Sequence, residues 1–141
     1  MNYYYIEPEV SGGLGCRTIM DRSVHPPIIS KLHFDMDGWL GDAILESFPC
    51  FVVTQEAKQG LVMMEATGGN FDDVDVTFTD RFKEQYRHRD VPSFAWLRPV
   101  GQAGQDDIGV ISDGRLVVSE RALSLLQKFG IANALIEPFT T

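Results

Sequence analysis

The sequence has few cysteines, and they do not form a recognisable pair. Cys16 and Cys50 lie far apart in a chain of 141 residues, without the CxxC spacing of a redox or zinc site. Such a pattern does not fit the disulfide framework of a small secreted domain. We expect both thiols to stay reduced, and we expect Cys50, within the apolar run of residues 48–53, to be buried.

Basic residues are also scarce. The chain carries 12 Lys and Arg against 20 Asp and Glu, which gives a formal charge of −8. Phosphate backbones and anionic lipids repel such a surface, so we expect no direct binding to nucleic acid or membranes. A basic protein would instead be attracted. The sequence has no apolar run of the ~20 residues that a membrane helix needs, and its first residues do not resemble a signal peptide, so a cytoplasmic protein is expected.

Common catalytic and cofactor-binding motifs are missing. The sequence contains no GxSxG nucleophile elbow, and the glycines of residues 12–15 lack the lysine and hydroxyl residue of a phosphate loop. The acidic residues 72–75 do not have the spacing of an EF-hand loop. We therefore expect a protein without enzyme activity, cofactor or metal.

Histidine supplies one alternative. The chain has three histidines, and none is paired at the HxxxH spacing of a zinc site. However, His25 and His33 share a turn-rich segment with Asp35 and Asp37. If these four side chains converged in a pocket, they would form the site of a small metal-dependent hydrolase.

The sequence does have enough apolar residues for one folded domain. Hydrophobic residues make up 44% of the chain, and strand-like and helix-like segments are interspersed irregularly. This favours an α+β fold: a single compact domain over residues 1–141, with a mixed or antiparallel sheet and three to four short helices. The expected strands include residues 3–6, 74–78, 93–97 and 134–137, the expected helices include 40–48 and 80–87, and residues 11–33 are expected to form a long loop.

Two segments repeat one pattern. Residues 51–57 and 116–122 each form a β-branched run that reaches a hydroxyl residue, Thr54 or Ser119, and then enters a helix-like segment. Glu56 and Glu120 follow in the first turn, where the helix dipole favours negative charge. The pattern predicts two strand–cap–helix units with equivalent buried faces. Chance similarity of a common motif is the alternative.

Acidic clusters supply the candidate partner-binding residues. Carboxylates complement a basic partner, and tryptophan is enriched at interface hot spots. Trp39 lies among the carboxylates and glycines of residues 35–42, although a core tryptophan that pins the long loop is the alternative. The candidates are Asp35, Asp37, Trp39, Asp42, Asp72, Asp73, Asp75, Asp106 and Asp107.

Several motifs resemble one bacterial family. They are the aromatic strand that ends in Glu7-Pro8, the Gly-Trp-Leu-Gly-Asp of residues 38–42, the Leu-Glu-Ser-Phe-Pro-Cys of residues 45–50, and the Leu-Val-Val-Ser-Glu-Arg-Ala of residues 116–122 before a helix that closes at Gly130. These motifs span most of the chain. They resemble the immunity proteins of polymorphic toxin systems (immunity family eleven), first described as a domain of unknown function.

The resemblance implies a cytoplasmic protein that binds and neutralises a cognate toxin domain, without catalysis or a cofactor. A basic nuclease is a toxin class that the acidic charge would suit, because an acidic inhibitor can imitate a phosphate backbone. A third hypothesis is a non-catalytic oligomeric accessory protein, for example a homodimer that pairs through residues 74–78 as an edge strand.

Overall fold

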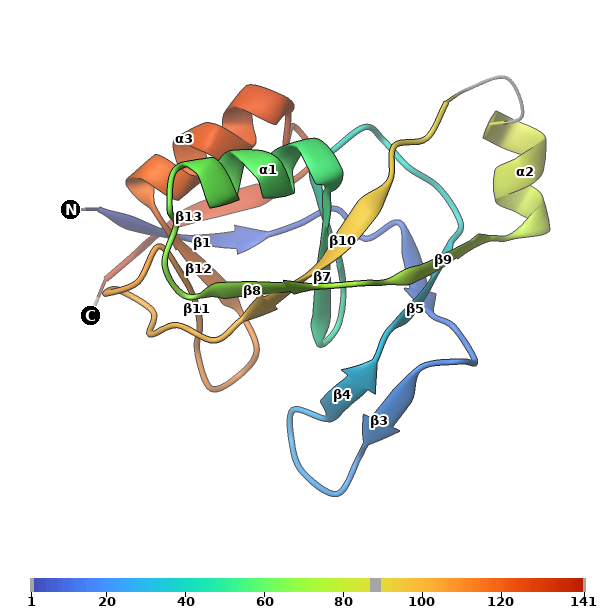
Figure 1. Ribbon diagram of the computed structural model, residues 1–141, viewed down its shortest axis with the longest axis horizontal. Helices are drawn as coiled ribbons and strands as arrows, with labels where there is room; N and C mark the ends of the chain where they lie inside the picture. Colours follow the sequence, from blue (N-terminus) through green and yellow to red (C-terminus); the bar gives the residue numbers. More distant parts are fainter. Residues whose placement is uncertain (1, 87–89, 141) are drawn as a thin grey trace.

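The computed structural model describes residues 2–86 and 90–140 and shows one α+β domain, as the sequence predicts. Within these residues the chain forms three helices and thirteen strands, arranged in four sheets. Two four-stranded sheets and two helices form the body, and the third helix and a projecting hairpin extend from it (Figure 1).

The two four-stranded sheets are named sheet A and sheet B. Sheet A has the order β11 (Ile108–Val110), β12 (Leu116–Ser119), β1 (Tyr3–Glu7), β13 (Leu135–Phe139). Sheet B has the order β6 (Ile44–Ser47), β7 (Cys50–Thr54), β10 (Phe94–Pro99), β8 (Gly69–Asp72). Neighbouring strands are antiparallel in both.

The two predicted strand–cap–helix units are confirmed. They are β7 followed by α1 (Gln55–Met63) and β12 followed by α3 (Glu120–Phe129). The Thr54 hydroxyl accepts a hydrogen bond from the Ala57 N–H at 3.2 Å, and the Ser119 hydroxyl accepts one from the Ala122 N–H at 3.2 Å. Each cap satisfies a backbone donor that the first helical turn leaves unpaired.

The likeness of these units extends to the whole body, which consists of two repeats. Each repeat has one strand, a two-stranded hairpin, a helix and a last strand. The repeats are β1, β6, β7, α1, β8 and β10, β11, β12, α3, β13. Their first strands are exchanged, because β1 lies between β12 and β13 in sheet A and β10 lies between β7 and β8 in sheet B. Tyr3 pairs with the cap residue Ser119, and Phe94 pairs with the cap residue Thr54 in the same register.

The exchanged strands also match in sequence. Residues 3–8 read Tyr-Tyr-Tyr-Ile-Glu-Pro and residues 94–99 read Phe-Ala-Trp-Leu-Arg-Pro, so aromatic, aliphatic, charged and proline positions coincide. The equivalent aliphatic residues Ile6 and Leu97 both belong to the main hydrophobic core. This match was not among the sequence predictions, because β1 is separated from its own hairpin by an insertion that β10 lacks.

The main core lies between the two sheets and the helix pair α1 and α3. A side-chain carbon on Gly60 of α1 would come within 3.0 Å of Leu125 of α3, so the two helices pack closely there. The largest fully buried side chains of this core are Ile6, Ile44, Phe51, Leu61, Leu97, Ile108, Leu116 and Leu126. Burial of one such side chain contributes about 1.5–3 kcal/mol to stability.

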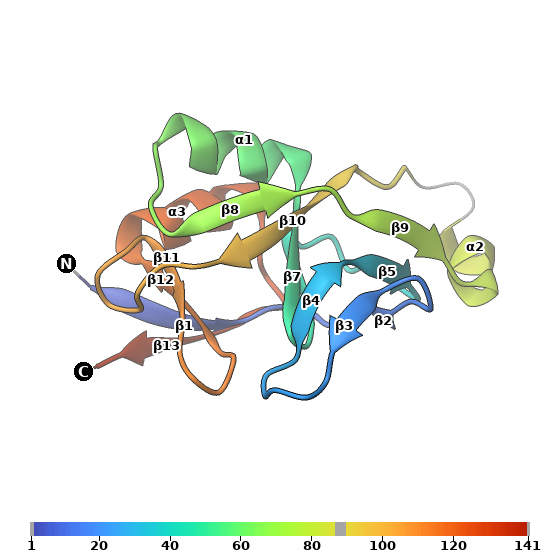
Figure 2. The same cartoon turned by 60° about the horizontal axis from the view of Figure 1, so that its bottom comes forward.

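Two additions have no counterpart in the second repeat, and both lie against the outer face of sheet B. The first comprises β2 (Gly12–Leu14), β3 (Ile19–Asp21), β4 (Ile28–Lys31) and β5 (His33–Met36), and the second comprises β9 (Asp75–Phe78) and α2 (Asp80–Tyr86). β5 pairs with β2 and, in parallel, with β9. Phe34 and Phe82 of the additions and Trp96 of sheet B belong to one second core. The β3–β4 hairpin projects away from the body (Figure 2).

The predicted loop over residues 11–33 is wrong, since that segment contains β2, β3 and β4. Its glycines allow close packing rather than disorder. A side-chain carbon on Gly12 would collide with the backbone of Asp35, and one on Gly15 would collide with the His33 ring. These two glycines, which the sequence pattern predicts as turn residues, therefore indicate close packing between neighbouring segments.

The predicted helix over residues 40–48 is also wrong, because residues 44–47 form β6 and pair with β7. Tertiary pairing here outweighs a local helical pattern. The helix predicted over residues 80–87 is confirmed as α2, although Arg87 lies outside the described residues. The last strand is confirmed as β13 and includes Pro138, which an edge strand tolerates. Among the described helices, none has the length and apolar character to cross a membrane.

Candidate functional site

Asp107 is a predicted partner-binding residue that is buried instead. Its carboxylate accepts hydrogen bonds from the Ser119 hydroxyl at 2.7 Å, the Thr67 N–H at 2.9 Å and the Arg121 guanidinium at 2.6 Å. The hydrogen bonds from Arg121 hold the pKa of Asp107 well below its usual range, more than burial raises it. Asp107 therefore joins the end of α1 to the start of α3 and is not available to a partner.

Asp42 is likewise buried, at 2% exposure. One carboxylate oxygen accepts from the Asn133 N–H and the other from the Asn133 side-chain amide, both at 2.9 Å. Its backbone carbonyl accepts a hydrogen bond from the Trp39 indole N–H at 3.0 Å. Asp42 holds the segment before β6 against the turn that follows α3, so its prediction as a surface contact is wrong.

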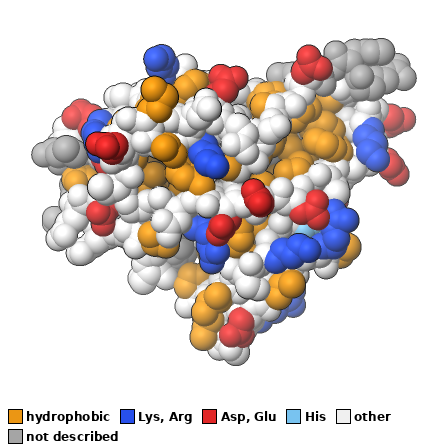
Figure 3. Space-filling view, in the orientation of Figure 1, with side chains coloured by type: hydrophobic (Ala, Val, Ile, Leu, Met, Phe, Trp, Pro, Cys, Tyr) orange, Lys and Arg blue, Asp and Glu red, His pale blue; other side chains and the backbone are white. Residues whose placement is uncertain are grey.

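Four further candidates lie on the surface but do not form one common site. Asp72 forms an ion pair with Arg98 at 2.9 Å, and Asp75 forms one with Arg17 at 2.7 Å. Asp106 accepts a hydrogen bond from the Gln102 N–H, and Asp73 is exposed. On the face that carries β8 and β9, acidic and basic side chains are interspersed (Figure 3).

Asp35, Asp37 and Trp39, the remaining candidates, line one hollow of about 630 Å³, named here the Asp35 hollow. Its walls come from β2, the segment after β5, and α2. Thus the additions that distinguish the first repeat from the second build this site. Among the predicted candidates, these three are the ones that the fold brings together.

Two threonines orient the carboxylates of this hollow. The Thr77 hydroxyl donates to Asp35 Oδ1 at 2.8 Å, and the Thr79 hydroxyl donates to Asp37 Oδ1 at 2.8 Å. Arg81 lies at the rim, with its guanidinium 3.8 Å from Asp37 Oδ2 and its side chain 71% exposed. The register of β5 against β9 places Asp35 opposite Thr77, and a threonine hydroxyl fixes one oxygen of each carboxylate.

His33 belongs to the support of Asp35. Its Nε2 lies 2.7 Å from the Thr77 hydroxyl, and its Nδ1 accepts the Arg17 N–H at 3.2 Å. Because the Thr77 hydroxyl donates its own hydrogen to Asp35, the His33 Nε2–H is the donor in its contact with the Thr77 oxygen. The buried His33 therefore keeps Thr77 and Asp35 oriented.

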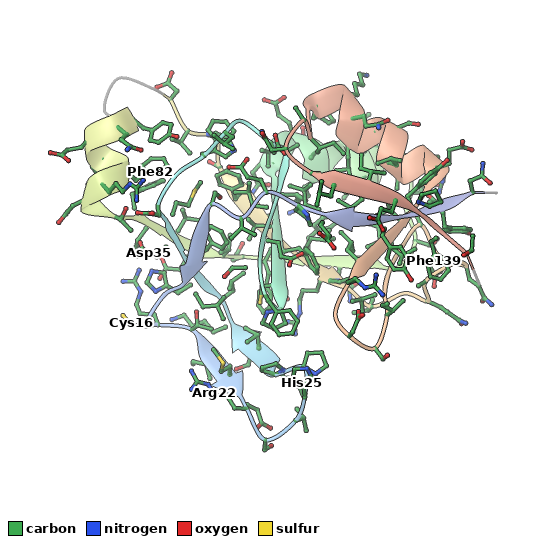
Figure 4. The ribbon with its side chains drawn as sticks, turned by 180° about the vertical axis from the view of Figure 1, so that it is seen from behind. Cys16, Arg22, His25, Asp35, Phe82 and Phe139 are labelled. Carbon is green, nitrogen blue, oxygen red and sulfur yellow. The ribbon has the colours of Figure 1, made fainter. Side chains whose placement is uncertain are left out.

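The predicted hydrolase site does not assemble. His25 lies at the far end of the β3–β4 hairpin, away from Asp35 (Figure 4), and its ring centroid is 6.1 Å from that of Phe48. In the part of the chain that the structure describes, no group of three or more His, Cys, Asp or Glu could hold a metal ion. The predicted grouping of His25 with His33, Asp35 and Asp37 is wrong.

Trp39 has the structural role considered for it. Its indole N–H donates to Asp42, and its ring contacts Phe94 edge to face at a centroid distance of 6.3 Å, so it pins the segment before β6 to the second core. It is only half-buried and also lines the Asp35 hollow. Trp39 therefore forms one wall of the Asp35 hollow, and its partner-binding role stays a prediction.

A second hollow of about 470 Å³ adjoins the first and was not predicted; it is named here the Glu46 hollow. Glu7, Glu46 and Asp113 line it together with four exposed apolar residues, namely Val10, Leu40, Phe48 and Leu135. The two hollows share Glu9, Val10 and Leu40. The Glu9 carboxylate accepts the Leu40 N–H at 2.7 Å and thereby fixes the ridge between them.

The two hollows together form the acidic face. Its ionisable residues are Glu7, Glu9, Asp35, Asp37, Glu46 and Asp113 against Arg81 and Arg115. At its centre Val10 is 72% exposed and Leu40 is 65% exposed. The sequence signal for this face was the acidic run Glu7-Pro8-Glu9 after an aromatic strand. It was not sufficient, because this run meets β6 through an isolated bridge between Glu9 and Leu45, which is a tertiary contact.

The surroundings of Glu46 disfavour its charged form. It is half-buried, and among the described residues none donates a hydrogen bond to its side chain. Burial raises the pKa of Glu46, and the nearby negative charge of Glu7 raises it further. The folded protein thus holds a carboxylate that a cation would stabilise.

Comparison with protein-family models, curated proteins and solved structures found no match for this chain.

Proposed function

We propose that this chain is an immunity protein, which acts in the cytoplasm of a toxin-producing cell and neutralises a cognate toxin domain by binding it. The observation that carries the proposal is the acidic face, where six carboxylates and two guanidinium groups surround the exposed Val10 and Leu40. Interfaces of this kind combine apolar anchors at the centre with a charged rim.

The motifs that resemble the immunity family support the proposal by their positions. Residues 38–42 contribute Gly38, Trp39 and Leu40 to the Asp35 hollow, and Glu7 and Pro8 line the Glu46 hollow. The motif of residues 116–122 forms scaffold instead, as β12 and the capped start of α3. The motifs thus divide into those that line the two hollows and one that builds the scaffold behind them.

Inhibition would proceed by occlusion. A basic toxin such as a nuclease needs a cationic surface for its own substrate, and an acidic face can occupy that surface. Charge complementarity raises the association rate, whereas apolar anchors such as Leu40 lower the dissociation rate. No chemical step and no cofactor is required of this chain.

Co-expression with the toxin encoded by the adjacent gene tests the proposal. We expect growth to be restored and a stoichiometric complex to be isolated. Val10→Arg, on the acidic face, should abolish protection because it places a cation against a basic partner. Val100→Arg is the matched control, since Val100 is 63% exposed and lines neither hollow of the acidic face. Toxicity that persists with the wild-type chain, or equal loss with both variants, would refute it.

A further inference from the structure

We infer that the acidic face receives one continuous partner segment in which two basic side chains flank an apolar one, the apolar side chain on the Val10–Leu40 ridge and one basic side chain in each hollow. The inference rests on the proposed function and specifies the partner's chemistry at that site.

The shape of the face supports a segment of this pattern. The Asp35 hollow and the Glu46 hollow are neighbours that share the ridge of Glu9, Val10 and Leu40. In a bound chain, side chains two positions apart in a strand lie on one face, and so do side chains three or four positions apart in a helix. A basic–apolar–basic pattern on one face of such a segment matches an acidic–apolar–acidic surface by charge and polarity.

Among the described residues that line the Glu46 hollow, one is a cation, and it is already paired. Arg115 lies nearby, but its guanidinium pairs with Asp113 at 2.9 Å and covers the Tyr5 ring. Glu46 is left half-buried next to Glu7, without a donor among the described residues. An incoming ammonium or guanidinium group would neutralise both glutamates.

The Asp35 hollow holds oriented acceptors and one unused hydroxyl. Asp35 and Asp37 each keep one oxygen bound to a threonine. Ser11 lines the same hollow, is 7% exposed, and its hydroxyl has no hydrogen-bond partner among the described residues. A guanidinium has five N–H donors in a planar fork, which suits several acceptors in one hollow better than a single point charge does. Arg81, loosely held at the rim, shows that this group fits the edge of the site.

The test is a titration of the isotopically labelled full chain with the peptide acetyl-Arg-Ser-Leu-Ser-Arg-amide at low salt, followed by amide chemical shifts; its two arginines and its leucine lie on one face when the peptide is extended. The expected shifts are confined to residues 9–14, 35–40 and 46. Acetyl-Glu-Ser-Leu-Ser-Glu-amide should produce none. Glu46→Gln and Asp35→Asn should each weaken the peptide's Kd by about three- to tenfold. Asp73→Asn removes the same charge from an exposed position outside both hollows, so it should change Kd by less than about twofold.

Thermal unfolding supplies a readout that a structural role would not give. The raised pKa means that the ionised Glu46 destabilises the folded state, so Glu46→Gln should raise Tm at pH 7. The gain should shrink as the pH falls below the usual carboxyl pKa of about 4.3, where Glu46 is protonated in both states. If Glu46→Gln binds the peptide less tightly and also unfolds at a higher temperature, the Glu46 carboxylate contributes to binding at the expense of stability.

Shifts spread over all acidic residues, equal effects of Glu46→Gln and Asp73→Asn, or a lower Tm for Glu46→Gln would each overturn the inference. A toxin that is neutralised equally well by wild type, Glu46→Gln and Asp35→Asn would overturn it while the proposed function stands. Peptide binding that depends on Glu46 and Asp35, together with failure to protect against the adjacent gene's toxin, would support the inference and refute the immunity role.

Discussion

At the residue scale, Asp107 and Glu46 are carboxylates whose surroundings have opposite effects. Asp107 is surrounded by donors from Ser119, Thr67 and Arg121, and its pKa is depressed. Glu46 has lost part of its hydration without gaining a donor, and its pKa is raised. The number of donors, rather than the depth of burial, decides whether a carboxylate stabilises this fold.

Replacement of Asp107 by asparagine should lower the free energy of unfolding at pH 7 by about 2–3 kcal/mol, a value below that of a fully buried pair because Arg121 is partly exposed. The folded pKa is depressed, so the stabilisation is complete above the unfolded pKa of about 3.9 and is lost as the pH falls below it. Urea unfolding of both proteins at pH 7 and near pH 3 should therefore show a difference that narrows in acid. An equal difference at both pH values would contradict the assigned role.

The sequence did not distinguish these acidic residues from one another. Asp35, Asp42 and Asp107 all lie in segments rich in Asp and Gly, which are typical of solvated turns. Their donors come from distant parts of the chain: Thr77 for Asp35, Asn133 for Asp42. Such partners are set by tertiary packing, so a local pattern could identify the charge but not its burial.

At the scale of single elements, the helix caps were predictable because the capping hydroxyl and the backbone N–H that donates to it lie three residues apart. Thr54 with Ala57, and Ser119 with Ala122, depend only on local sequence. β6 was misassigned as a helix because its partner β7 fixes its conformation. Short-range interactions can be inferred from a sequence in this fold, whereas strand pairing cannot.

The two caps should differ in strength. Thr54→Ala removes one capping hydrogen bond and should cost about 1 kcal/mol. Ser119→Ala should cost about 2 kcal/mol, because the Ser119 hydroxyl also donates to Asp107 Oδ1 at 2.7 Å, and its loss leaves a buried acceptor with one donor fewer. Chemical denaturation of the two variants measures both values. In an Asp107→Ala background, which removes the acceptor, the two costs should become similar; a persistent difference would count against the shared hydrogen bond.

At the scale of the whole molecule, the exchange of β1 and β10 ties the two repeats together. Each strand is internal to the sheet of the other repeat, since β1 separates β12 from β13 and β10 separates β7 from β8. The α+β class was predictable from the mixture of segments. The exchange of the two strands was not predictable, because no local pattern in residues 3–7 indicates that they pair with β12, which begins at Leu116.

A chain divided between Asp90 and Val91 should show this dependence directly. Residues 1–90 lack the internal strand of sheet B, and residues 91–141 lack that of sheet A. Neither fragment should fold alone, whereas a mixture should recover a cooperative thermal transition and elute as a one-to-one complex. Circular dichroism and size-exclusion chromatography measure both. Cooperative unfolding of either fragment by itself would contradict the exchange as the basis of the fold.

The exchange also has an evolutionary consequence. A half-length ancestor with one such unit could complete its sheet only by lending its first strand to a second copy, so it would fold as a concentration-dependent pair. Fusion of two copies removes that dependence, because the second unit is always present at a high effective concentration. It also frees one copy to diverge. An insertion in a symmetric pair would appear twice, but in the fused chain it appears once, so one lobe gains the Asp35 hollow while the other keeps the founding framework.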